Sequence, residues 1–157
     1  MSQQAPTVEE DNVVGFDAAT EKVIQLLTGG SKELEVISIV GMLGLGKTTL
    51  AKKVLNDPKI EYDFFARNFI YVSQKFEKRE VLLNILGSIG QLTEEVNKMP
   101  EPELARHLRK QLESIKYLIV MDDVWEDKDW DVLKVAFPNN KKGSRVLITT
   151  RFNHVAT

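Results

Sequence analysis

Residues Gly41-Met42-Leu43-Gly44-Leu45-Gly46-Lys47-Thr48 decide the fold class of this chain. The stretch matches the pattern G-x-x-x-x-G-K-[ST] at every fixed position. Glycines at these positions let backbone N–H groups turn toward phosphate oxygens without a Cβ in the way. A helix that begins at Lys47 would direct its positive dipole end at the same anion. The sequence therefore predicts a phosphate-binding loop between a strand and a helix.

Strand and helix patterns alternate on both sides of this loop. Further strands are predicted at residues 36–40, 69–72, 117–121 and 145–149, and helices at Asp17 up to Gly29, 47–56, 78–89 and from Glu101 onward. Such alternation is typical of crossover units, in which helices cover both faces of a parallel sheet. We therefore expect one α/β domain with a mostly parallel sheet, a three-layer α/β/α arrangement over residues 11–157. Residues 1–10 are polar and patternless, and we expect a flexible lead-in there.

Composition limits the classes of function. The chain has 157 residues, 43% of them hydrophobic and 28% charged, with a net charge of −2 and no cysteine. This is typical of a soluble globular domain in a reducing compartment, and it excludes a disulfide framework. Without a basic run, nothing indicates sequence-specific or non-specific binding of nucleic acid. The longest apolar run is far shorter than the roughly 20 residues that span a bilayer. We expect a cytoplasmic or nucleo-cytoplasmic protein with no membrane partner.

Two side chains of the loop are suited to bind a nucleotide, and two carboxylates at the end of a later strand are suited to act with them. Lys47 would neutralise the β- and γ-phosphates, and the Thr48 hydroxyl would contribute to a Mg²⁺ shell. The predicted strand at 117–121 ends in Asp122 and Asp123. Because the carboxyl ends of parallel strands line the ligand crevice, Asp122 would reach the Mg²⁺ that Thr48 holds. Asp123 would polarise an attacking water or orient the metal shell.

The predicted strand at 145–149 also ends in polar groups, Thr149, Thr150 and Arg151. A guanidinium is suited to bidentate contact with phosphate oxygens. Arg151 is therefore a candidate for contact with a γ-phosphate.

Taken together, these segments resemble the nucleotide-binding core of plant disease-resistance proteins. The similar segments are residues 42–49, 65–74, 118–125 and 143–151, in the same order and spacing. They resemble the NB-ARC module of the coiled-coil, leucine-rich-repeat class of immune receptors, which has a P-loop NTPase fold. Within this class, the sequence most resembles the solanaceous receptors. The resemblance covers nearly the whole chain.

The resemblance implies a molecular switch in plant defence that holds ADP at rest, exchanges it for ATP on activation and hydrolyses ATP slowly. It implies Mg²⁺ at Thr48 and Asp122, the hydrolytic water near Asp123, and Arg151 as sensor. It implies nucleotide contacts at Val14, Gly15, Gly41, Gly44, Leu45, Gly46, Lys47, Thr48 and Thr49. The implied partners are the nucleotide and the other receptor domains: the ARC subdomains, the coiled coil and the leucine-rich repeats.

The resemblance also implies that the nucleotide-binding subdomain is incomplete at its C-terminus. The sensor strand would lie next to a further strand that this chain lacks. The backbone beside Val146, Leu147 and Ile148 would then form an open sheet edge. On this basis we expect self-association at high concentration.

Other functions stay open at this point. An autonomous P-loop ATPase or nucleotide kinase would need an arginine-bearing lid or a basic nucleic-acid track, and the sequence shows neither. A GTPase would need an Asn-Lys-x-Asp guanine reader, and residues 140–143 read Asn-Lys-Lys-Gly, which favours adenine. A partner-binding module that holds nucleotide only weakly is the remaining alternative.

Overall fold

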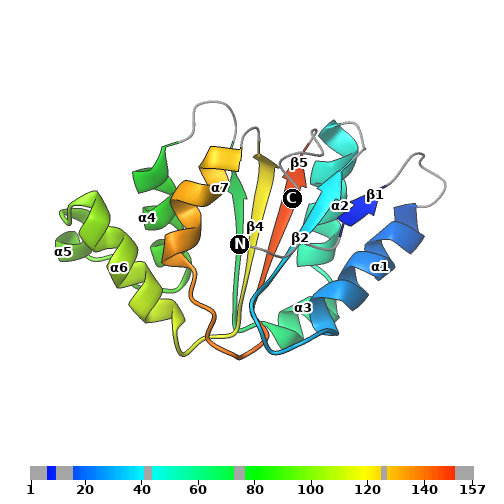
Figure 1. Cartoon of the computed structure of the whole chain (residues 1–157), viewed down its shortest axis with the longest axis horizontal. Helices are drawn as coiled ribbons and strands as arrows, with labels where there is room; N and C mark the ends of the chain where they lie inside the picture. The colour runs from blue at the N-terminus through cyan, green and yellow to red at the C-terminus, as the bar shows by residue number, and fades with distance from the viewer. Residues whose placement is uncertain (1–6, 10–15, 41–43, 73–76, 125–126, 151–157) are drawn as a thin grey trace.

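The computed structural model describes residues 7–9, 16–40, 44–72, 77–124 and 127–150 (Figure 1). They form a five-stranded sheet in the order β1-β2-β5-β4-β3. The strands are β1 (Thr7–Glu9), β2 (Glu35–Val40), β3 (Ala66–Tyr71), β4 (Tyr117–Val124) and β5 (Arg145–Thr150). The four strand pairings within these residues all run parallel, as predicted.

Helices cover both faces of the sheet (Figure 1). They are α1 (Phe16–Thr28), α2 (Gly44–Leu55), α3 (Pro58–Asp63), α4 (Lys78–Ser88), α5 (Glu94–Asn97), α6 (Glu101–Leu112), α7 (Asp127–Leu133) and the 3-10 turn η2 (Lys134–Ala136). In β4, Leu118 and Val120 pack in one core with α1, α2 and α3, whereas Ile119 and Met121 pack in a second core with α4 and α6. Because successive side chains of a strand point to opposite faces, both cores meet at one sheet. The three-layer α/β/α prediction is confirmed.

Local chemistry explains where the helices begin. The Asp57 carboxylate accepts a hydrogen bond of 2.8 Å from the Lys59 N–H, and Pro58 occupies the first turn of α3. In α6, glutamates at 101 and 103 lie in the first turn, where the helix dipole favours negative charge. Its buried residues, Leu104, Ala105, Leu108 and Leu112, form one stripe that packs against the second core.

Among the helices that the structure describes, none is long and apolar enough to cross a membrane.

The position of β5 differs from the expectation of an open edge. β5 lies inside the sheet, paired with β2 on one side and with β4 on the other. Val146, Leu147 and Ile148 are buried. The edge prediction was wrong because the neighbours of a strand are set by pairing with segments far away in the sequence. The self-association that was expected from that edge therefore loses its basis.

Within the predicted flexible lead-in, the structure describes residues 7–9, and these three form a strand. Thr7–Glu9 form β1, which pairs in parallel with Ser38, Ile39 and Val40 of β2. The outer edge of β2 presents N–H and C=O groups that need partners, and these three residues supply them. Three residues are too few to show an alternating pattern, so the sequence carried no strand signal here.

Candidate functional site

The candidate site lies at the carboxyl end of the sheet, where β2, β4 and β5 end and α2 begins (Figure 1). α2 begins at Gly44, about one turn before the predicted start at Lys47. The first four N–H groups of an α-helix have no partner within the helix, and the dipole there favours anions. The glycine-rich segment therefore contributes the first helical turn, and its N–H groups are suited to a phosphate.

Lys47 brings a buried positive charge to this end of the sheet. Its side chain is only 1% exposed. Its ammonium donates a hydrogen bond of 2.6 Å to the backbone carbonyl of Thr150, the last residue of β5. Burying an ammonium group is costly without polar partners, and the Thr150 carbonyl is one such partner. The contact joins the start of α2 to the end of β5.

Asp122 is the central acceptor of the site. It is fully buried, and each of its carboxylate oxygens accepts a hydroxyl. Thr48 Oγ1 donates to Oδ2 at 2.8 Å, and Thr149 Oγ1 donates to Oδ1 at 2.7 Å. Three elements, α2, β4 and β5, therefore meet at one carboxylate.

Asp123 follows in an unusual backbone conformation. Its φ is +63°, in the left-handed region, and the β4–β5 register shifts between Met121 and Val124. The Asp123 N–H donates to Thr149 Oγ1 at 2.8 Å, and its Oδ2 accepts from the Tyr71 hydroxyl at 3.3 Å. A left-handed residue costs roughly 1–2 kcal/mol, less for Asp, and such strain is concentrated at functional sites. The bulge places two consecutive carboxylates at the sheet end.

Three features thus meet at the carboxyl end of a parallel sheet: a buried ammonium, a helix start and a buried carboxylate. Residues 16–157 match the family model of the NB-ARC domain. The chain belongs to the NB-ARC family. The resemblance predicted from the motifs is confirmed.

Relatives of this NB-ARC domain include plant resistance proteins. The chain is 42% identical over 153 residues to the disease resistance protein RPP13 of Arabidopsis thaliana, across 94% of this chain and 18% of that protein. It is 40% identical over 154 residues to the putative late blight resistance protein homolog R1B-19 of Solanum demissum, across 98% of this chain and 12% of that protein. The chain therefore spans less than a fifth of the length of these relatives.

A solved structure shares the fold of this NB-ARC domain. The Aeropyrum pernix ORC2 protein, solved in ADPNP–ADP complexes, superposes with a TM-score of 0.56 at 16% sequence identity. The match covers 99% of this chain and 45% of that one. At this identity the likeness concerns the fold alone, and it supports the predicted α/β class.

The structure brings four of the predicted site residues together: Lys47, Thr48, Asp122 and Asp123. Gly46 lies beside them in the first turn of α2, whereas the Thr49 side chain is exposed on the same helix. The backbones of Gly44 and Leu45 also belong to that turn. Four predicted residues lie outside the described residues: Val14, Gly15, Gly41 and Arg151.

Sequence reasoning missed two hydroxyl groups of the NB-ARC site. Thr149 joins the two aspartates, and Tyr71, the last residue of β3, donates to Asp123. Thr149 had a signal, because a polar residue directly after the apolar run 146–148 falls at the carboxyl end of a strand. Tyr71 had none, since an aromatic residue is ordinary in a strand.

The oxygen donors of the site suit Mg²⁺. Thr48 and Asp122 offer a hydroxyl and a carboxylate 2.8 Å apart, and Mg²⁺ prefers such hard oxygen ligands. Within the described residues, no group of three or more His, Cys, Asp or Glu side chains can hold a metal ion. A site with one carboxylate is typical of Mg²⁺ that arrives with a phosphate ligand and keeps several waters.

Proposed function

We propose that this NB-ARC domain binds an adenine nucleotide, ADP or ATP, together with Mg²⁺, as the switch domain of a plant immune receptor. The observation that carries the proposal is the convergence of Lys47, Thr48 and Asp122 at the start of α2. Membership of the NB-ARC family and the similarity to plant disease resistance proteins support it. Hydrolysis of ATP is expected to be slow.

Each residue of the site has a distinct task in this proposal. The N–H groups in the first turn of α2 bind phosphate oxygens, and the Lys47 ammonium neutralises them. For this the ammonium exchanges its contact with the Thr150 carbonyl for a phosphate oxygen. Thr48 and Asp122 hold the metal. When bound, Mg²⁺ supplies positive charge that reduces repulsion among the phosphate oxygens.

Turnover depends on Asp123 and Arg151 in this proposal. Asp123 orients the hydrolytic water, with its carboxylate held by the Tyr71 hydroxyl at 3.3 Å. Arg151 follows β5 and acts as the sensor of the γ-phosphate. Fast hydrolysis needs water exclusion and preorganised charges around the γ-phosphate. In the receptor, the further domains would supply part of both, so we expect little turnover by this domain alone.

Adenine is favoured over guanine. The nearest sequence match to a guanine reader is Asn-Lys-Lys-Gly at residues 140–143, which lacks the aspartate. The Asn140 amide donates to the carbonyls of Leu112 and Ile115, at 2.9 and 2.7 Å. This turn precedes β5, so it lies at the amino end of the sheet and not at the end that holds Lys47. We place the adenine near Val14 and Gly15, as the family resemblance implies.

The partners in this proposal are the other domains of a longer receptor in the cytoplasm: the ARC subdomains, the coiled coil and the leucine-rich repeats. The relatives, which are more than five times the length of the matched region, support this. Neither a membrane nor a nucleic acid is a proposed partner.

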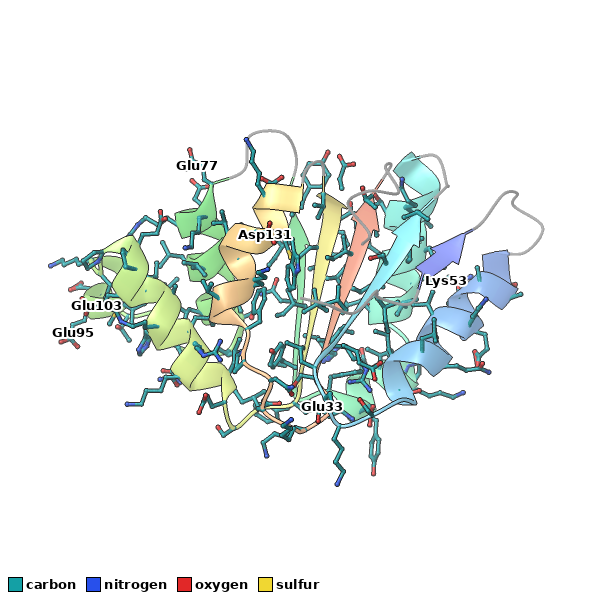
Figure 2. All side chains as sticks on the ribbon, in the orientation of Figure 1. Glu33, Lys53, Glu77, Glu95, Glu103 and Asp131 are labelled. Carbon is teal, nitrogen blue, oxygen red and sulfur yellow. The ribbon has the colours of Figure 1, made fainter. Side chains whose placement is uncertain are left out.

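The test is calorimetric titration of the chain with ADP, ATP and GTP, each with and without Mg²⁺. We expect roughly micromolar or tighter binding of ADP and ATP, stronger with Mg²⁺, and weaker binding of GTP. Lys47→Ala should abolish most of the binding. The matched control is Lys53→Ala, which removes an exposed lysine of α2 whose ammonium pairs with Asp17 at 3.0 Å (Figure 2). A folded chain that binds neither adenine nucleotide would contradict the proposal.

A further inference from the structure

Thr149 stands out among the residues at the carboxyl end of the sheet. It is 1% exposed, and its one hydroxyl serves two consecutive aspartates. It donates to Asp122 Oδ1 at 2.7 Å and accepts from the Asp123 N–H at 2.8 Å. Three residues before it in β5 are apolar, so a valine would suit the strand equally well. Strand formation and packing therefore do not explain why residue 149 carries a hydroxyl.

The first consequence of this hydroxyl concerns the bulge in β4. The register between β4 and β5 shifts between Met121 and Val124, and Asp123 has a φ of +63°. A residue within a bulge loses its ladder partner. The Thr149 hydroxyl takes the Asp123 N–H in place of a backbone carbonyl, which avoids a buried donor without a partner. Thr149 thereby stabilises the backbone conformation that presents both carboxylates.

The second consequence concerns the orientation of the Asp122 carboxylate. Because Thr149 occupies Oδ1, the rotation of the carboxylate is restricted, and Oδ2 faces Thr48. Thr48 and Asp122 are the residues that would hold Mg²⁺ in the proposed function. Groups that hydrogen-bond a metal ligand fix its direction, and their loss weakens metal binding.

We propose that Thr149 is a positioning residue for the magnesium site: it selects Oδ2 of Asp122 as the metal-facing oxygen and holds the Asp122–Asp123 bulge. This inference rests on the proposed function. It assigns to β5 a task besides carrying Arg151, because the strand then orients the metal ligand directly.

The test compares Thr149→Val, Thr149→Ser and wild type. Thr149→Val removes the hydroxyl at nearly constant shape, and Thr149→Ser keeps it. The matched control is Tyr117→Phe, which removes a buried hydroxyl at the other end of β4, where it donates to the Pro138 carbonyl at 2.7 Å. ADP affinity is measured by calorimetry in EDTA and in Mg²⁺, and Mn²⁺ affinity of the ADP complex by electron paramagnetic resonance.

We expect Thr149→Val to lower Mn²⁺ affinity roughly tenfold while ADP affinity in EDTA stays unchanged. Thr149→Ser should restore Mn²⁺ affinity, and Tyr117→Phe should not change it. Unchanged Mn²⁺ affinity in a folded Thr149→Val chain would overturn the inference. So would an equal loss of ADP affinity with and without metal, since that would indicate general damage to the site. Thr149→Ala replaces the valine variant if the latter fails to fold.

A second measurement does not depend on nucleotide. Hydrogen exchange of the Asp123 amide, followed by NMR in the ligand-free chain, should be faster in Thr149→Val than in wild type, and Thr149→Ser should restore the slow exchange. Equal exchange rates in all three would overturn the inference. If wild type binds no ADP, the proposed function fails, and with it the role of Thr149 toward the metal. If wild type binds ADP and the valine variant responds normally to Mn²⁺, only the inference fails.

Discussion

The two ends of β5 each hold a buried cation, and the two cations are used differently. At the amino end, Arg145 is 2% exposed, and its guanidinium donates to four backbone carbonyls. These belong to Gly29, Ser31, Glu33 and Ser144, at 2.7–3.0 Å. At the carboxyl end, Lys47 is equally buried and contacts the Thr150 carbonyl. Figure 2 marks the amino end with Glu33, in the loop that Arg145 holds.

The comparison shows how burial of charge separates structure from function. A planar guanidinium has donors in a fixed fork, which suits carbonyls that do not move. Burial lowers the pKa of Arg145, and the carboxylates of Glu35 and Asp63 oppose that shift. The lysine ammonium is a point charge on a flexible side chain, which suits a ligand that binds and dissociates. We infer that Arg145 stabilises the fold at the amino end of β5, whereas Lys47 at the carboxyl end binds the ligand of the proposed function.

The largest expected effect is on the amino end. Arg145→Met would remove the donor of four backbone carbonyls, of which that of Ser144 is buried, and the free energy of unfolding should fall by about 2–4 kcal/mol. Urea denaturation measures it. Arg145→Lys should recover only a small part, because the fork is lost. A loss below about 1 kcal/mol would break the comparison, since the arginine would then not hold the loop.

The carboxyl end should respond in affinity and not in stability. Lys47→Arg keeps the charge but replaces a point charge by a planar fork in a tight turn, and ADP affinity should fall about tenfold, or 1.4 kcal/mol. Calorimetry measures the affinity, and urea denaturation should show a smaller change than for Arg145→Met. Wild-type affinity in this variant would show that Lys47 does not contact phosphate.

Asp122→Asn sharpens the comparison at the same end. The amide removes the negative charge that would hold Mg²⁺ in the proposed function, so ADP affinity in Mg²⁺ should fall roughly tenfold, to the value measured in EDTA. The ADP affinity in EDTA should change little. Full Mg²⁺ dependence in this variant would exclude Asp122 as a metal ligand.

The smallest effect is expected for Tyr117, which lies at the amino end beside Ser144. Tyr117→Phe removes a buried hydrogen bond to the Pro138 carbonyl and should cost about 1 kcal/mol of unfolding free energy near neutral pH. ADP affinity should stay at the wild-type value. A change in affinity would mean that the two ends are coupled.

Tyr117 also predicts a dependence on pH. Burial raises the pKa of its hydroxyl well above the usual value. The folded chain therefore keeps the proton longer than the unfolded chain, and the associated stability is present below about pH 10 and lost as the pH rises further. The loss is at most about 1.4 kcal/mol per pH unit. The unfolding free energies of wild type and Tyr117→Phe should differ at about pH 8 and become similar at about pH 11.

The sequence carried enough information for most helices and for the inner strands. Apolar runs of β-branched residues indicate buried strands, and the stripe in α6 indicates an amphipathic helix, because both signals are local. The placement of β5 between β2 and β4 was missed because strand order is a long-range property. For the same reason β1 was missed, since pairing with β2 and not a local pattern makes it a strand.

Prediction of the site followed the same division. Lys47, Thr48 and Asp122 stand at motif positions with a chemical task, and the structure brings them together. The role of Thr149 depends on the bulge in β4, which no pattern in the sequence announces. Gly44 begins α2 earlier than expected, because the glycines fit the first helical turn as well as a loop.

The central place of β5 has a consequence for synthesis on the ribosome. β5 follows every other described strand in the chain, and its Arg145 contacts Glu33 across 112 positions. Until these residues leave the ribosome, the inner edges of β2 and β4 lack the strand that pairs with both of them. Such edges are exposed to aberrant pairing, and long-range parallel pairing is slow. We expect a nascent chain that stalls before β5 to be prone to such pairing, and it has neither the ammonium contact nor the bulge that complete the site.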